Sequence, residues 1–228
     1  MQVPKIKSYL AQYQHWQVSE AGLALRHFWE TQANWQANFE LEATDLARAY
    51  DQALSSQSSR RHYSRQAFEP KEVMLALLRH EPELARATFE DLLREGHTLD
   101  GRLSRFEVYI QELFKRYLEA KKESPWGDHF HGDDYFMPTL YLSCQYPDRY
   151  LPYYTETLLK ICERLGARNP PQAADPVRFM KLAKLLDRFL QQNEALQEQY
   201  REKFLRPVDY QGETLLQSWH FMRFIAEE

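Results

Sequence analysis

The chain has 228 residues, of which 43% are hydrophobic and 27% charged, with a formal net charge of −4. This composition is ordinary for a folded globular protein and provides enough apolar residues for a substantial core. Only seven residues are glycine, and neither GxxxxGK(S/T) nor GxGxxG occurs, so the sequence excludes both kinds of phosphate-binding loop. Proteins whose whole surface binds nucleic acid are usually basic, so any DNA contact must come from a local patch.

The two cysteines, Cys144 and Cys162, form no CxxC motif, which argues against a disulfide framework or a zinc module. The first residues contain no long apolar stretch, so no signal peptide is expected. The longest clean apolar run, 74–78, is far too short to span a bilayer. We therefore expect a cytoplasmic protein that does not enter a membrane.

Helical periodicity dominates the chain, and no alternating run is long enough to predict a strand. The spacing of apolar residues predicts about ten helices in an irregular all-α bundle. Asp175-Pro176 is typical of a helix start, and Gly166 is typical of a helix end. In chain order, the expected helices lie at about 19–37, 43–55, 70–80, 82–94, 98–122, 134–145, 158–165, 176–190, 193–204 and 212–226.

Three polar or proline-rich stretches, 55–66, 121–134 and 167–175, are predicted loops. A boundary in the first of them would separate an N-terminal helical subdomain, 1–66, from a main helical bundle, 67–228. The two segments could equally form one continuous domain.

The loop at 55–66 is rich in serine and carries the densest positive charge in the chain. Arg60, Arg61 and Arg65 could neutralise phosphates, and Tyr63 could stack on a base. The arginines have no acidic neighbour in sequence closer than Asp51 on one side and Glu69 on the other. The alternative, which we favour, is a solvated linker.

Tyrosines are concentrated at 135–154. Tyr146, Tyr150 and Tyr154 could form an aromatic surface on which nucleic-acid bases stack. Packing between two helices around the turn at 146–148 is the favoured reading, with hydroxyl groups reaching the surface.

Only one cluster suggests a metal. His129, His131 and Asp133 have metal-ligand chemistry at short spacing, but no further ligand is evident. Asp133 or Asp134 would more naturally cap the helix that follows. Neither cysteine has an activating histidine beside it, and no GxSxG turn occurs. We expect no metal, no cofactor and no catalytic site.

The segment 129–166, HFHGDDYFMPTLYLSCQYPDRYLPYYTETLLKICERLG, resembles a stretch in the N-terminal regions of McrB-like proteins, the AAA+ motor subunits of modification-dependent restriction systems. There a His/Asp-rich turn leads into a helix, a YPDKY-like element and an amphipathic helix ending in LG. The segments 83–93, 99–113 and 25–35 resemble helices of the same family. The sequence departs from the pattern in its Ser-rich basic loop, at Tyr135, and in having no motor domain.

The resemblance implies a non-catalytic recognition or adaptor module of a restriction or anti-phage defence system. Its expected ligand is DNA, either plain or modified. Its expected partners are an AAA+ motor domain, in cis or in trans, and a nuclease subunit. The alternative is a protein-interaction or scaffold domain that docks the nuclease or senses a phage protein. The resemblance assigns no binding residue to this chain.

Overall fold

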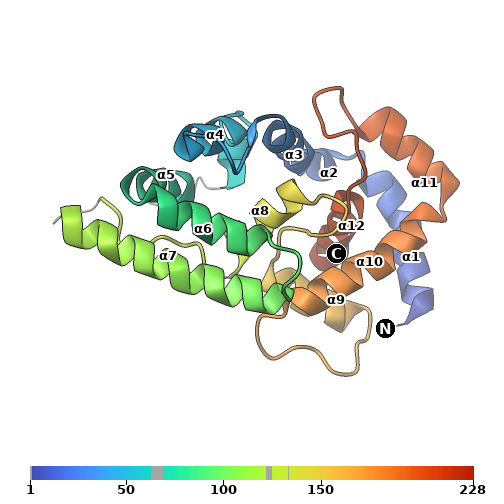
Figure 1. Ribbon diagram of the computed structural model, residues 1–228. Coiled ribbons are helices and arrows are strands. Elements are labelled where there is room, and N and C mark those ends of the chain that lie inside the picture. The colour runs from blue at the N-terminus through green and yellow to red at the C-terminus, as the bar shows by residue number, and fades with distance from the viewer. Residues whose placement is uncertain (1, 63–68, 122–124, 133) are drawn as a thin grey trace.

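The computed structural model describes residues 2–62, 69–121, 125–132 and 134–228, and these residues confirm the all-α class: they contain helices but no strand (Figure 1). None of these helices combines the length and the apolar character needed to cross a bilayer. The helices are α1 (Val3–Trp16), α2 (Glu20–Ala24), α3 (His27–Asn38), α4 (Leu46–Ala53), η1 (Ser59–His62), α5 (Pro70–His80), α6 (Pro82–Leu93), α7 (Leu99–Lys121), α8 (Phe136–Gln145), α9 (Thr155–Arg164), α10 (Pro176–Gln191), α11 (Glu194–Gln199), η2 (Tyr200–Phe204) and α12 (Leu216–Glu227).

Local sequence sets the ends of the best-predicted helices. The side chain of Asp175 accepts a hydrogen bond from the backbone of Arg178 at 2.8 Å, and Pro176 occupies the first turn of α10, as expected. Gly166 ends α9 with a φ of +66°, where its backbone N–H bonds to Glu163 and that of Ala167 to Cys162. These two hydrogen bonds satisfy carbonyl groups in the last turn of the helix, and the left-handed backbone conformation at this position favours glycine.

Two parts of the helix prediction are wrong. The first expected helix begins at about residue 19, but α1 is fourteen residues long and buries Ile6, Leu10 and Tyr13 at helical spacing. The expected helix at 19–37 is two helices, because the chain turns between α2 and α3. Within α2, a Cβ at Gly22 would lie 2.3 Å from the Trp16 carbonyl oxygen, so the end of α1 and α2 pack backbone to backbone.

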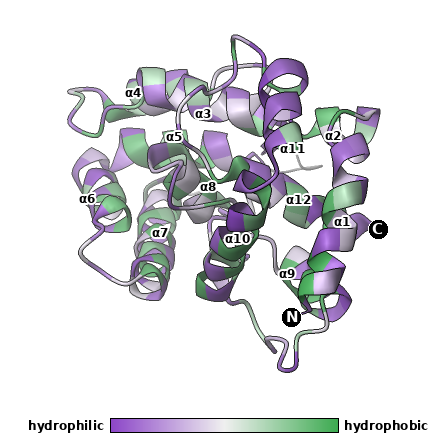
Figure 2. Ribbon diagram, turned by 90° about the vertical axis from the view of Figure 1, so that its right-hand side faces the viewer, coloured by the Kyte–Doolittle hydropathy of each residue, from purple (hydrophilic) through white to green (hydrophobic). Residues whose placement is uncertain are grey.

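The C-terminal helix α12 lies at the centre of the fold (Figure 1). It packs against α1, α9 and α10, and from Leu216 to Ala226 all of its residues except Arg223 are buried. A helix that is enclosed on every side must be surrounded by the rest of the chain. The surrounding helices are amphipathic, and Figure 2 shows hydrophobic and hydrophilic residues along each of them.

The segments before and after residue 66 share one hydrophobic core. Three side chains of α3 carry polar contacts across that boundary. Trp29 donates its indole N–H to the Tyr200 hydroxyl at 2.5 Å, and Gln32 donates to the Ser143 carbonyl at 2.8 Å. Trp35 donates to the side-chain oxygen of Gln145 at 3.0 Å. A boundary at residue 66 therefore does not separate two cores.

His220 joins three helices from inside the core. The fully buried ring lies 2.7 Å, through Nδ1, from the Tyr13 hydroxyl of α1 and 2.9 Å, through Nε2, from the Gly22 carbonyl of α2. The carbonyl can only accept, so Nε2 carries the proton and Nδ1 accepts from Tyr13. Both ends of the chain are thereby fixed to each other.

The Tyr13→Phe substitution should lower the free energy of unfolding by about 1–3 kcal/mol, because it leaves the buried Nδ1 of His220 without a donor. Tyr9→Phe is the matched control, since the Tyr9 hydroxyl, on the same helix and partly exposed, makes no hydrogen bond within the described residues. Urea unfolding of the two variants measures the difference. Equal stability of Tyr13→Phe and wild type would contradict the role given to this contact.

Candidate nucleic-acid interface

The structure places Arg60 and Arg61, which are neighbours in sequence, in different surroundings on η1. Arg60 is exposed and lines a cavity of about 570 Å³ together with Asp51, Glu69 and Glu72. Arg61 donates to the Ala24 carbonyl at 3.2 Å and lines a separate cavity. The acids that looked distant in sequence thus lie beside Arg60.

The other two residues proposed for the basic loop, Tyr63 and Arg65, lie outside the described residues. Of the four arginine and tyrosine candidates in that loop, the structure therefore places only Arg60 and Arg61. These two do not form a common positive surface, because one shares its cavity with three carboxylates.

The tyrosine-rich segment packs against its neighbours. The half-buried Tyr146 donates its hydroxyl to the Leu93 carbonyl at 2.9 Å, and Tyr150 receives a hydrogen bond from Arg102. Tyr154 packs on Phe136, with ring centroids 5.0 Å apart. This geometry corresponds to the packing alternative, with hydroxyl groups at the rim, more closely than to a flat stacking platform.

The histidines of the possible metal cluster are buried. The backbone N–H of His131 donates to Nδ1 of His129 at 3.1 Å, and the His131 ring lies 3.1 Å from the Tyr141 hydroxyl. Burial lowers the pKa of His131 to about 3. Asp133 is outside the described residues, and elsewhere in the described chain no three His, Cys, Asp or Glu side chains group as metal ligands.

At the start of α8 the side chain of Asp134 accepts a hydrogen bond from the backbone N–H of Phe136 at 2.9 Å, although the N-cap position itself is Tyr135. The two cysteines are buried on helix faces, and burial raises the pKa of Cys144 to about 12. A thiol held in its protonated form is a poor nucleophile.

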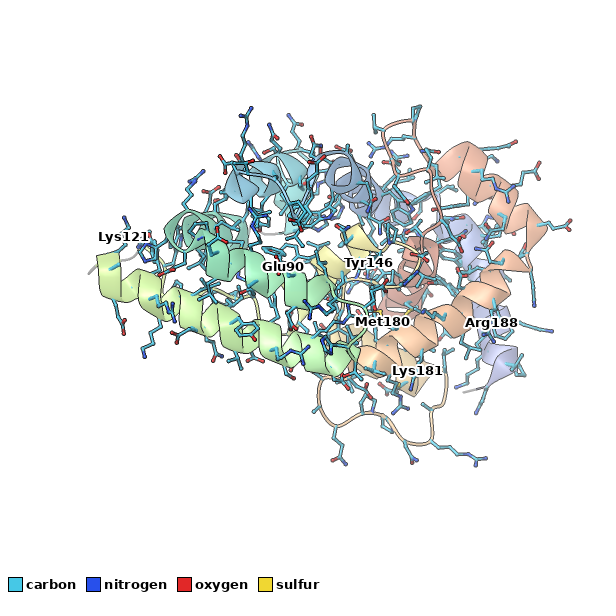
Figure 3. The ribbon with its side chains drawn as sticks, in the orientation of Figure 1. Glu90, Lys121, Tyr146, Met180, Lys181 and Arg188 are labelled. Carbon is cyan, nitrogen blue, oxygen red and sulfur yellow. The ribbon has the colours of Figure 1, made fainter. Side chains whose placement is uncertain are left out.

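A basic surface that the sequence reading missed lies on α10. Arg178, Lys181, Lys184 and Arg188 recur at steps of three and four, so they share one stripe of the helix. Phe179, Leu186 and Leu190 occupy the opposite, buried face. Figure 3 shows Lys181 and Arg188 on α10, far from Lys121 at the end of α7.

The stripe continues into a cleft of about 780 Å³, which we call the basic cleft. Its lining includes Arg168, Arg178 and Lys181 and, among the described residues, no carboxylate. Lys5 lies close by, because its amine donates to the carbonyl of Arg164 at the end of α9 at 3.0 Å. In Figure 2 the loop from α9 to α10 lies beside this helix.

None of the cations of this surface forms an ion pair within the described part of the chain: Arg168, Arg178, Lys181, Lys184 and Arg188. Asp187, the one acid of α10, is half-buried and accepts a hydrogen bond from Gln191 instead. On α7, by contrast, Arg116 pairs with Glu112 at 2.8 Å and Lys115 with Glu119 at 4.0 Å. The basic residues of α10 are therefore available to an anionic ligand.

Comparison with known proteins identifies no relative that could assign a function to this chain. No protein-family model matches the chain, and neither a curated protein nor a solved structure is significantly similar to it. The likeness to McrB-like proteins thus remains a prediction from the residues quoted above.

The buried histidines predict sensitivity to acid. Burial lowers the pKa of His131 and His220 to about 3 each, whereas the unfolded chain binds these protons near pH 6.5. The unfolded state therefore holds more protons between these values, and the free energy of unfolding should fall as the pH drops below about 6.5. Each histidine contributes up to about 1.4 kcal/mol per pH unit.

Urea unfolding between neutral and mildly acidic pH measures this slope, and NMR of the imidazole protons identifies the groups. The signals of His131 and His220 should stay in the neutral form as long as the protein is folded. A folded-state titration of either ring near pH 6.5 would contradict the prediction.

Proposed function

We propose that the chain is a DNA-recognition module that contacts the phosphate backbone through the basic cleft and the stripe of α10. The observation that carries the proposal is the set of five cations without an ion-pair partner among the described residues, next to a cleft lined by no described carboxylate. Phosphate contacts supply most of the sequence-independent affinity for DNA. A chain with a net charge of −4 needs such a concentrated surface to bind a polyanion.

The dimensions of the stripe suit a duplex. From Arg178 to Arg188 the helix rises about 15 Å, at 1.5 Å per residue. Double-stranded DNA carries one charge per roughly 1.7 Å of axis, so several phosphates lie within reach of side chains along this length. Such contacts position a protein on DNA, whereas sequence or a modified base is read by other groups.

The resemblance to McrB-like proteins supplies the biological setting of the proposal. In this setting the chain works in the cytoplasm of a defence system, without catalysis of its own. An AAA+ motor, in cis or in trans, and a nuclease subunit act on the DNA that the module engages. A protein-interaction domain is the competing function, and no contact in the described residues favours it over DNA.

The decisive variant changes Lys181, Lys184 and Arg188 to Gln. Its affinity for a labelled duplex should fall, and the slope of log affinity against log salt should flatten by up to about three units, at roughly 0.9 per phosphate contact. Folding should hardly change, since the three side chains are exposed. Fluorescence anisotropy over a salt series, with plain and methylated duplexes, measures both quantities.

The matched control changes Lys115, Arg116 and Lys121 of α7 to Gln, which removes the same amount of charge from a distant helix whose cations are partly paired. This variant should keep the wild-type salt slope. If the two variants bind DNA alike, or if the wild type binds no duplex at low salt, the proposal is wrong.

A further inference from the structure

The loop that joins α9 to α10 extends beyond the helices on either side of it (Figures 1 and 2). We call residues 167–174 the projecting loop. Two of its residues, Arg168 and Asn169, line the basic cleft, and the loop leads directly into the helix that carries the basic stripe. A ligand that lies along the stripe and over the cleft therefore also meets the projecting loop.

The side chains of the projecting loop suit nucleic acid. Its sequence, ARNPPQAA, contains no acid, and its only polar side chains are those of Arg168, Asn169 and Gln172. All three are exposed, and within the described residues none of these side chains has a hydrogen bond or an ion pair. Arginine, asparagine and glutamine are among the residues with which proteins read the minor groove of DNA.

Both ends of the projecting loop are fixed to the body of the protein. At its start the backbone N–H of Ala167 donates to the Cys162 carbonyl at 2.7 Å. At its end the backbone N–H of Asp175 donates to the hydroxyl of the buried Tyr153 at 2.9 Å. The Asp175 carboxylate accepts from the backbone N–H of Arg178 at 2.8 Å, so this acid is already engaged by α10.

Two prolines restrict the middle of the loop. The rings of Pro170 and Pro171 fix φ near −65°, and each proline also disfavours helical backbone at the residue before it. A segment with few accessible backbone conformations loses less freedom when it binds. The projecting loop is therefore better prepared for a fixed contact than a segment rich in glycine or serine.

The shape of the loop favours the narrower groove of a duplex. Apart from its three polar residues it consists of three alanines and two prolines, so it is slim. The minor groove is about 6 Å wide, whereas the major groove, at about 12 Å, has room for a whole helix. The minor groove is narrowest in runs of A·T pairs, where its negative potential attracts arginine.

We propose that the projecting loop enters the minor groove beside the phosphates that α10 contacts, and that Arg168 gives the protein a preference for A·T pairs. In that groove A·T pairs present only acceptors, whereas a G·C pair adds the amino donor of guanine. The guanidinium of Arg168 can only donate, so it is matched by A·T pairs. The amides of Asn169 and Gln172 lie beside it. This inference rests on the proposed function, to which it adds a base preference.

The first test compares three duplexes of equal length, whose central blocks consist of A·T, G·C or inosine·C pairs. Inosine lacks the amino group of guanine, so an inosine·C pair resembles A·T in the minor groove and G·C in the major groove. In fluorescence anisotropy at one salt concentration, the A·T and inosine·C duplexes should both bind roughly tenfold more tightly than the G·C duplex. Equal affinity for all three would overturn the inference, as would an inosine·C duplex that binds like G·C.

The second test compares two exposed arginines. Arg168→Gln should bring the affinities for the A·T and G·C duplexes close to each other. Arg188→Gln is the matched control, because a contact to phosphate carries no sequence information. It should weaken binding to all three duplexes by the same factor and keep the preference for A·T. If both variants keep the preference, or both lose it, the assignment of Arg168 is wrong. Circular dichroism of each variant checks its folding.

These measurements separate the inference from the proposed function. A wild type that binds all three duplexes alike, with a salt slope that flattens in the α10 triple variant, would refute the groove contact and leave the phosphate contacts in place. A wild type that binds no duplex at low salt would refute both.

Discussion

The fold depends on satisfying the polar groups of a helix that has no solvent face. Because α12 is buried from Leu216 to Ala226 apart from Arg223, its polar side chains take most of their partners from other elements. His220 contacts Tyr13 and Gly22, Gln217 receives a hydrogen bond from Gln197 at 2.8 Å, and Arg223 donates to Thr157. These contacts determine which elements surround α12, and they join α1, α2, α9 and α11 to it.

The proposed basic surface is supported by this central helix. The apolar face of α10 packs against α12, so its basic stripe stands on a rigid support.

Periodicity in the sequence was sufficient for the fold class and for the helices with strong caps. It predicted α10 from Asp175-Pro176 and the end of α9 from Gly166, because those residues act through local geometry. It missed α1, although Ile6, Leu10 and Tyr13 recur there at helical spacing, and it missed the turn after α2. The close approach of Gly22 to Trp16 could not be predicted, because it depends on how α1 and α2 pack.

The candidate sites also differ in how far local sequence could predict them. Arg60 and Arg61 looked like one cluster because they are adjacent in sequence, but a 3-10 turn directs them into different cavities. The basic stripe of α10 could have been predicted, because its residues follow the spacing of a helix face. The prediction of this helix used only its apolar residues.

The charge pattern of α10 is also unfavourable for the isolated helix. Arg178 and Lys181, Lys181 and Lys184, and Lys184 and Arg188 are like charges at helical spacings of three or four residues. Each such pair costs the helix about 0.2–0.5 kcal/mol, whereas the opposite-charge pairs of α7 stabilise theirs by a similar amount. An acid at position 181 or 184 would relieve the repulsion, but the chain places none there. A row of phosphates lying along the stripe would remove the same repulsion, so under the proposed function DNA binding would stabilise α10 through these charges.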